Sequence, residues 1–123
     1  MTPEGARKLK VKKWLTEIGA YWFMPVQTGY GKKALDFMGC YFGEFFAIET
    51  KGREDDYRPH QKVIADEITA AGGVVFLVLD DTSLALAKAH LKMVAGICPD
   101  CGERLSSQYH KPACSWNNNV ARS

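Results

Sequence analysis

A chain of 123 residues that is 46% hydrophobic can bury one compact core, which excludes a disordered tail or adaptor. Its formal net charge of +2 does not by itself indicate a nucleic-acid partner. Basic residues nevertheless crowd the first segment and suit a polyanion, although a charge run is also typical of a solvated helix face. These residues are Arg7, Lys8, Lys10, Lys12 and Lys13.

The sequence shows no signal peptide and no apolar run of the roughly 18 residues that a membrane span needs. We therefore expect a cytoplasmic protein. In a reducing compartment, its four cysteines are expected to be thiols or metal ligands rather than disulfides.

The first segment has the pattern of a helix. Thr2 is suited to the N-cap, Pro3 to the first helical position, and Gly19 to the end. Apolar residues recur at helical spacing between them. Residues 21–26 then predict a strand with Pro25 near its edge, and residues 27–33 predict a loop.

Residues 34–40 and 44–51 predict two strands of a hairpin that turns near residues 41–43. After a charged loop, a helix is expected from Pro59 to about Ala71. The continuous apolar run 74–79 predicts a strand covered on both faces, and residues 83–95 a last helix. The step from strand 44–51 through a helix to strand 74–79 fits a parallel crossover. Residues 1–95 thus form an α/β domain, and residues 96–123 differ in composition and form a small tail.

Glu49 and Lys51 lie two residues apart on a predicted strand, so both side chains leave the same face. If the hairpin turns at residues 42 and 43, Asp36 lies directly opposite Glu49, with β carbons roughly 5 Å apart. Two carboxylates that close repel each other, and a divalent cation would relieve the repulsion. The alternative is a surface salt bridge between Glu49 and Lys51, with Asp36 unrelated.

These residues resemble a known nuclease signature. Leu35-Asp36, followed after twelve residues by Glu49-Thr50-Lys51, is similar to the PD-(D/E)XK motif on a helix–strand–strand–strand–helix–strand order. The surrounding segments resemble the virus-type replication-repair nuclease (VRR-NUC) domain, particularly short stand-alone forms from bacteriophages. They are 2–5, 29–31, 39–51, 59–61 and 71–73, and the likeness spans residues 2–79. Leu35 replaces the usual proline, which shapes the backbone rather than doing chemistry.

The resemblance implies a restriction-endonuclease-like αβββαβ core with a central mixed sheet flanked by helices. It also implies that Asp36, Glu49 and the Thr50 carbonyl bind Mg²⁺ or Mn²⁺, and that Lys51 positions or activates the attacking water. Glu4 matches an acidic position that can complete the metal site, or it simply complements the helix dipole. Gln61 matches a glutamine that faces the active site and is counted with the catalytic residues, the alternative being a solvated helix residue.

A glycine-containing loop precedes Asp36. Its Tyr30, Lys32 and Lys33, together with Lys8 and Lys12 of the first helix, are candidate DNA contacts. An ordinary connecting loop is the alternative.

The tail has the spacing C-x2-C-x8-H-x3-C, formed by Cys98, Cys101, His110 and Cys114. Four such ligands suit tetrahedral Zn²⁺, and Gly102 allows the tight turn of a zinc knuckle. Four protein ligands leave no open position, so this zinc would be structural. A redox CxxC is the competing interpretation, but the strand–helix context of such a motif is missing.

Three hypotheses follow. The first is a Mg²⁺-dependent DNA endonuclease; by resemblance it cuts branched DNA as a Holliday-junction-resolvase-like homodimer, in the host cytoplasm if the protein is phage-encoded. The second is a non-catalytic nucleic-acid-binding module on a nuclease fold with a zinc knuckle. The third is an α/β domain whose ion pairs are structural.

Overall fold

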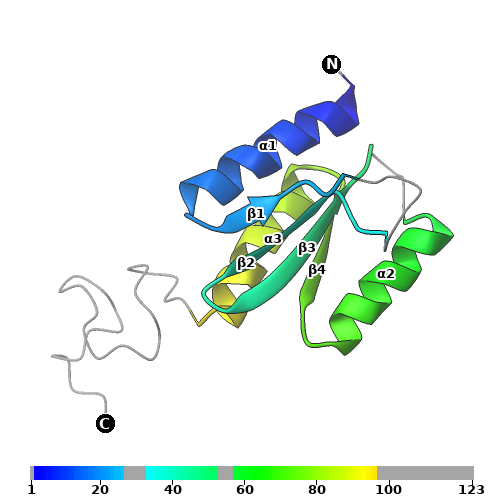
Figure 1. Cartoon of the computed structure of the whole chain (residues 1–123). Helices are drawn as coiled ribbons and strands as arrows, with labels where there is room; N and C mark the ends of the chain where they lie inside the picture. The colour runs from blue at the N-terminus through cyan, green and yellow to red at the C-terminus, as the bar shows by residue number, and fades with distance from the viewer. Residues whose placement is uncertain (1, 27–32, 53–56, 97–123) are drawn as a thin grey trace, which may run out of the picture.

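The computed structural model describes residues 2–26, 33–52 and 57–96, which form an α/β fold with a four-stranded mixed sheet (Figure 1). In chain order the elements are α1 (Pro3–Glu17), β1 (Tyr21–Phe23), β2 (Phe37–Tyr41), β3 (Glu44–Thr50), α2 (Pro59–Ala70), β4 (Val74–Val78) and α3 (Asp81–Val94). Tyr30, Lys32 and the four predicted zinc ligands lie outside the described residues.

The strands lie in the order β1-β2-β3-β4. β1 pairs with β2, and β2 with β3, in antiparallel fashion, whereas β3 and β4 are parallel. A parallel pair needs a crossover connection, and α2 supplies it, as the sequence predicts.

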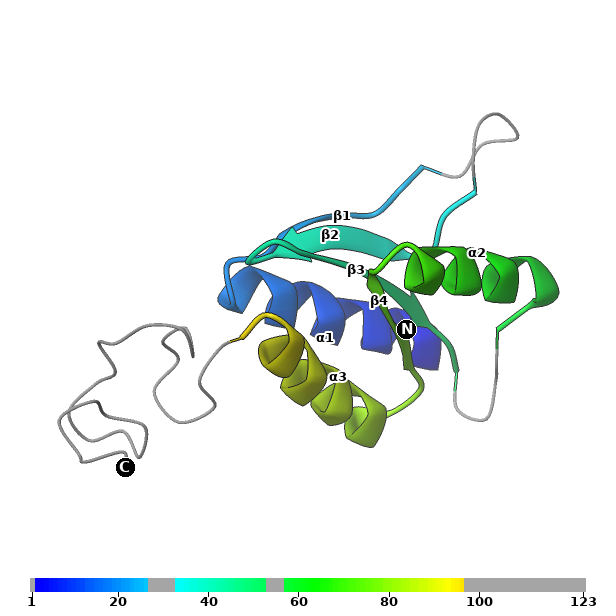
Figure 2. The same ribbon diagram turned by 90° about the horizontal axis from the view of Figure 1, so that it is seen from below.

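The helices cover the sheet from both sides. Figure 2 shows α1 and α3 on one face and α2 on the other. The larger core cluster joins Leu15 of α1 and Leu91 of α3 to Phe46 and Val78 of the sheet. A smaller cluster packs Ile64 of α2 on Ala47 and the fully buried Leu35. Apolar residues of β4 therefore meet helices on both faces, which explains the unbroken apolar run.

The hairpin between β2 and β3 sets the register that matters most for function. Phe42 and Gly43 both have positive φ (48° and 83°), as a two-residue type I′ turn requires. Phe37 is consequently paired with Ile48, as expected from a turn at these two residues. Within β2, a Cβ on Gly39 would lie 2.1 Å from the Tyr21 carbonyl oxygen, so only glycine at this position lets β1 approach β2 this closely.

The helix starts are fixed by side-chain caps. Thr2 Oγ1 accepts a hydrogen bond from the Gly5 N–H at 3.0 Å, which confirms the predicted N-cap. α3 begins at Asp81, two residues before the predicted start, because Asp80 and Ser83 cap each other reciprocally.

β3 and β4 each end one residue before the predicted end, and β1 and β2 differ more from their predicted bounds. β1 ends at Phe23 rather than at residue 26, consistent with Pro25 lacking a backbone N–H. β2 begins at Phe37 rather than at residue 34, because the Asp36 N–H donates to the side chain of Glu49 instead of to a backbone carbonyl. No helix of the described part of the chain is long and apolar enough to cross a membrane.

Candidate active site

The candidate site lies where β3 ends and the chain enters β2. Asp36 immediately precedes β2, and Glu49 and Thr50 are the last two residues of β3. Lys51 follows and stays attached to the sheet, since its N–H donates to the Val78 carbonyl at 3.1 Å. Asp36, residues 49–51 and Val78 thus meet at one end of the sheet strands.

Asp36 is held by Thr50. Its Oδ2 accepts hydrogen bonds from the Thr50 N–H at 3.0 Å and from the Thr50 hydroxyl at 2.7 Å. The Asp36 N–H in turn donates to Glu49 Oε1 at 3.1 Å. Backbone and side chain of Asp36 are therefore both fixed by the end of β3, and the two carboxylates are neighbours as the hairpin register predicts.

Glu49 is almost completely buried, with 2% of its surface exposed. Lys51 Nζ lies 3.7 Å from Glu49 Oε2, and the Gln61 side-chain amide donates to the same oxygen. Gln61 is itself oriented, because its Oε1 accepts from the Arg58 N–H at 2.8 Å. One side chain thus caps the start of α2 and aims its amide at Glu49.

The burial of this cluster rules out a surface salt bridge. The side chains of Lys51 and Glu49 are 10% and 2% exposed, and Asp36 is in hydrogen-bond contact with Glu49. Burying a charged group is costly unless it is paired or binds something. The alternative in which Asp36 is unrelated to Glu49 and Lys51 is therefore wrong.

The surroundings of Glu49 disfavour its ionised form. Burial, first, and the neighbouring Asp36 carboxylate, second, raise the pKa of Glu49 to about 7, although Lys51 and the Asp36 N–H act in the opposite direction. The attraction of Lys51 therefore does not offset the cost of ionising the buried Glu49 carboxyl beside Asp36. An additional cation would lower the free energy of the ionised pair.

The two carboxylates fit a divalent metal of the magnesium type. Mg²⁺ is commonly held by one or two carboxylates, with waters and substrate phosphates completing its shell. Within the described ranges no group of three or more His, Cys, Asp or Glu residues could hold a metal ion. Carboxylate oxygens are ligands that Mg²⁺ prefers, and the Thr50 carbonyl as a third ligand remains a prediction.

The basic residues of α1 have different partners. Lys8 Nζ lies 3.9 Å from both Asp36 Oδ1 and Glu4 Oε1, so it contacts the candidate site directly. Lys10 pairs with Asp81 at 2.7 Å, and the Arg7 Nε–H donates to the Leu79 carbonyl at 2.8 Å. Part of the basic run therefore fixes α1 to α3 and β4, a role that a charge pattern alone does not reveal.

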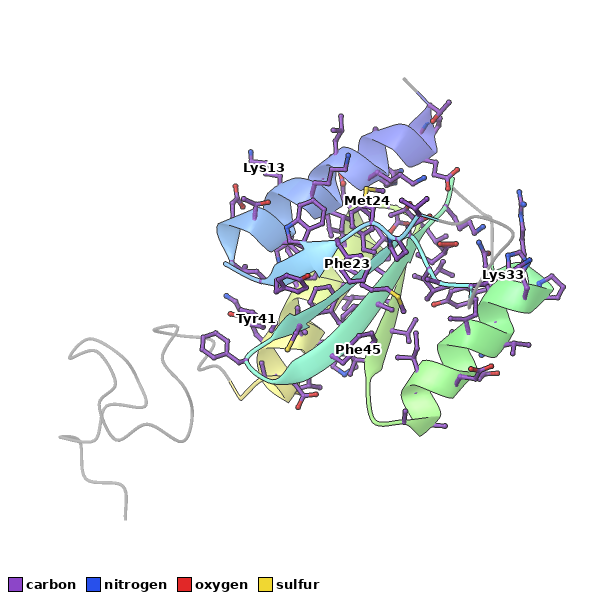
Figure 3. The ribbon with its side chains drawn as sticks, viewed as in Figure 1. Lys13, Phe23, Met24, Lys33, Tyr41 and Phe45 are labelled. Carbon is purple, nitrogen blue, oxygen red and sulfur yellow. The ribbon has the colours of Figure 1, made fainter. Side chains whose placement is uncertain are left out.

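The remaining predicted DNA contacts among the described residues are Lys12 and Lys33. Lys12 is partly buried on α1, and Lys33 is exposed beside α2 (Figure 3). Glu4 lies in the first turn of α1, and its partner Lys8 links it to Asp36. Sequence reasoning missed this bridging position of Lys8, for which spacing along the chain gives no signal.

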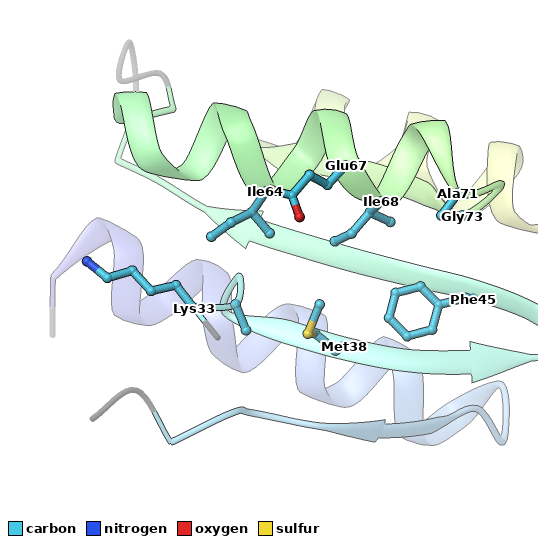
Figure 4. Close-up of a pocket in the computed structure, with 9 residues that line it drawn as sticks. Lys33, Met38, Phe45, Ile64, Glu67, Ile68, Ala71 and Gly73 are labelled. Carbon is cyan, nitrogen blue, oxygen red and sulfur yellow. The ribbon is translucent and has the colours of Figure 1, made fainter. Parts of the chain in front are cut away.

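A separate apolar hollow of about 410 Å³ runs between α2 and the β2–β3 hairpin (Figure 4). Its lining consists of Lys33, Ala34, Met38, Phe45, Ile64, Glu67, Ile68, Ala71 and Gly73. Neither carboxylate of the candidate site belongs to it. Most of its lining is apolar, and its charged residues Lys33 and Glu67 do not form a pair of carboxylates, so we place the candidate site at Asp36 and Glu49 instead.

Comparison with known proteins adds no assignment, since neither a protein-family model nor a curated protein matches the chain.

Proposed function

We propose that this protein is a magnesium-dependent nuclease that hydrolyses DNA phosphodiester bonds at Asp36, Glu49 and Lys51. The observation that carries the proposal is a buried carboxylate, Glu49, beside the partly exposed carboxylate of Asp36, with an ammonium group 3.7 Å from Glu49. Phosphodiester hydrolysis needs negative charge to be neutralised and a water to be oriented and deprotonated. The sequence resemblance to the PD-(D/E)XK signature points to the same three residues.

In this proposal Asp36 and Glu49 hold the divalent cation. The cation, when bound, lowers the pKa of a coordinated water and offsets charge on the phosphate. Lys51 donates a hydrogen bond that orients the attacking water beside Glu49. Gln61 positions Glu49 through its amide, and Thr50 positions Asp36 through its N–H and hydroxyl.

The finer features are part of the same proposal. The mixed sheet flanked by helices is compatible with a restriction-endonuclease-like core. A chain with one such site makes paired incisions in branched DNA only as a homodimer, which is the assembly we propose. Cys98, Cys101, His110 and Cys114 hold a structural zinc ion, to be tested by counting zinc per chain in the wild type and in Cys98→Ser.

The direct test is cleavage of a four-way junction and of supercoiled plasmid in Mg²⁺ or Mn²⁺. We expect the wild type to cut, and Asp36→Ala and Lys51→Ala to bind DNA without cutting. Asp66→Ala is the matched control, since Asp66 is an exposed carboxylate of α2 paired only with Lys62 among the described residues. Cutting that survives in the Asp36 and Lys51 variants refutes this site. Binding by the wild type without cutting in either metal supports a non-catalytic module instead.

A further inference from the structure

Lys8 occupies an unusual position at the edge of the candidate site. Its ammonium nitrogen lies between two carboxylates, 3.9 Å from Asp36 Oδ1 and 3.9 Å from Glu4 Oε1. Glu4 is one helical turn before Lys8 on α1, whereas Asp36 belongs to the sheet. A single positive charge therefore connects the first helix to a proposed metal ligand.

The oxygen that faces Lys8 is the one that can exchange partners. Asp36 Oδ2 accepts hydrogen bonds from the Thr50 N–H at 3.0 Å and the Thr50 hydroxyl at 2.7 Å, whereas the Lys8 ammonium lies 3.9 Å from Oδ1. The side chains of Lys8 and Asp36 are 32% and 19% exposed. Partly exposed ion pairs at such distances are weak, so a divalent cation can displace Lys8 without disturbing the fold.

Three other basic groups of α1 have partners elsewhere. Lys10 pairs with Asp81 on α3, Lys13 pairs with Glu17 at 4.0 Å, and Arg7 binds the Leu79 carbonyl. Lys51 approaches Glu49 rather than Asp36. Within the described part of the chain, Lys8 is thus the lysine that neutralises Asp36.

We propose that Lys8 is the resting counter-ion of the metal site and that metal binding transfers it to the DNA. In the metal-free chain its ammonium partly neutralises Asp36 and Glu4. When Asp36 and Glu49 bind a divalent cation, the ammonium is repelled from Asp36 and becomes available to a phosphate of the incoming strand. This regulation rests on the proposed function, because it concerns the same metal site.

The first test measures Mn²⁺ affinity by calorimetry, without DNA, in the wild type, Lys8→Gln and Lys13→Gln. Lys13→Gln removes the same charge from the same helix but has its ion pair with Glu17 (Lys13 is labelled on α1 in Figure 3). We expect Lys8→Gln to bind Mn²⁺ about fivefold more tightly, the upper range for a partly exposed ion pair. Lys13→Gln should match the wild type.

The second test measures junction-DNA affinity in Ca²⁺, which takes the same oxygen ligands, and in EDTA. Lys8→Gln should weaken DNA binding in Ca²⁺ and leave it unchanged in EDTA, where Asp36 already holds the lysine. Unchanged Mn²⁺ affinity in Lys8→Gln, or an equal loss of DNA affinity in both conditions, overturns the role of Lys8. If the Lys8 tests fail while the wild type binds Mn²⁺ and cuts DNA, the proposed function still stands. A wild type that binds no Mn²⁺ overturns both the proposed function and the role of Lys8.

Discussion

Replacing Glu49 by glutamine tests how the site holds its charge. Burial first, and the Asp36 carboxylate second, raise the pKa of Glu49 from 4.5 to about 7. Glutamine keeps the shape of a protonated glutamate but cannot ionise. The variant therefore lacks the unfavourable free energy that the metal-free wild type acquires when Glu49 becomes charged.

The sign and size follow from linkage. Between the ordinary and the raised pKa, folded Glu49 keeps a proton that the unfolded chain has released, so the free energy of unfolding falls as pH rises. A pKa shift from 4.5 to about 7 corresponds to about 3 kcal/mol. The stability of Glu49→Gln minus that of the wild type should thus grow by about 3 kcal/mol from about pH 4 to about pH 8. Loss of the Gln61 contact in the variant would shift this stability difference by the same amount at every pH, and would not alter its change with pH.

The assay is urea unfolding in EDTA across that pH range, followed by tryptophan fluorescence, because Trp14 is buried in the core. Glu17→Gln is the control, since it removes a carboxylate whose side chain is 60% exposed. Saturating Mg²⁺ should reduce the increase of this stability difference with pH, because the cation stabilises the ionised Glu49 carboxylate of the wild type. The reasoning would be refuted if the free energy of unfolding of Glu49→Gln minus that of the wild type were independent of pH or fell as pH rises.

Three further substitutions probe other parts of the account. Lys51→Met should abolish cleavage yet leave Mn²⁺ binding intact by calorimetry; loss of both would show that Lys51 supports the metal site. Thr50→Val removes the 2.7 Å hydroxyl bond to Asp36 and should lower the free energy of unfolding in urea by about 1 to 2 kcal/mol, and an unchanged value would contradict that bond. Gly39→Ala places a Cβ 2.1 Å from the Tyr21 carbonyl oxygen and should destabilise the fold by about 2 kcal/mol or more. Cys40 is the exposed neighbour of Gly39, and Cys40→Ala should change stability little. Equal losses of stability in Gly39→Ala and Cys40→Ala would disprove the close approach of β1.

The pairing of Asp36 with Glu49 could be predicted because it depends on local chemistry. A turn at Phe42 and Gly43 fixes the register of the whole hairpin, so residues on either side are matched by counting. The common face of Glu49 and Lys51 follows in the same way from strand periodicity. These are short-range rules that sequence expresses directly.

The position of Lys8 could not be predicted, because it depends on how α1 docks across the sheet. That docking is decided by long-range packing of buried residues such as Leu15 and Phe46. The start of β2 was misplaced for a related reason, since a side chain of β3 takes the Asp36 N–H. The double role of Gln61, as helix cap and as partner of Glu49, likewise appears only when α2 is in place.

The most direct test of the central claim is the rate at which a fluorescently labelled four-way junction is cut as Mg²⁺ is increased. The account predicts no cutting in EDTA, a rate that saturates with Mg²⁺, and a loss of about 100-fold or more in Glu49→Gln that is still folded by tryptophan fluorescence. Cutting that proceeds in EDTA, or at the wild-type rate in folded Glu49→Gln, would contradict a magnesium-dependent nuclease site at Asp36, Glu49 and Lys51.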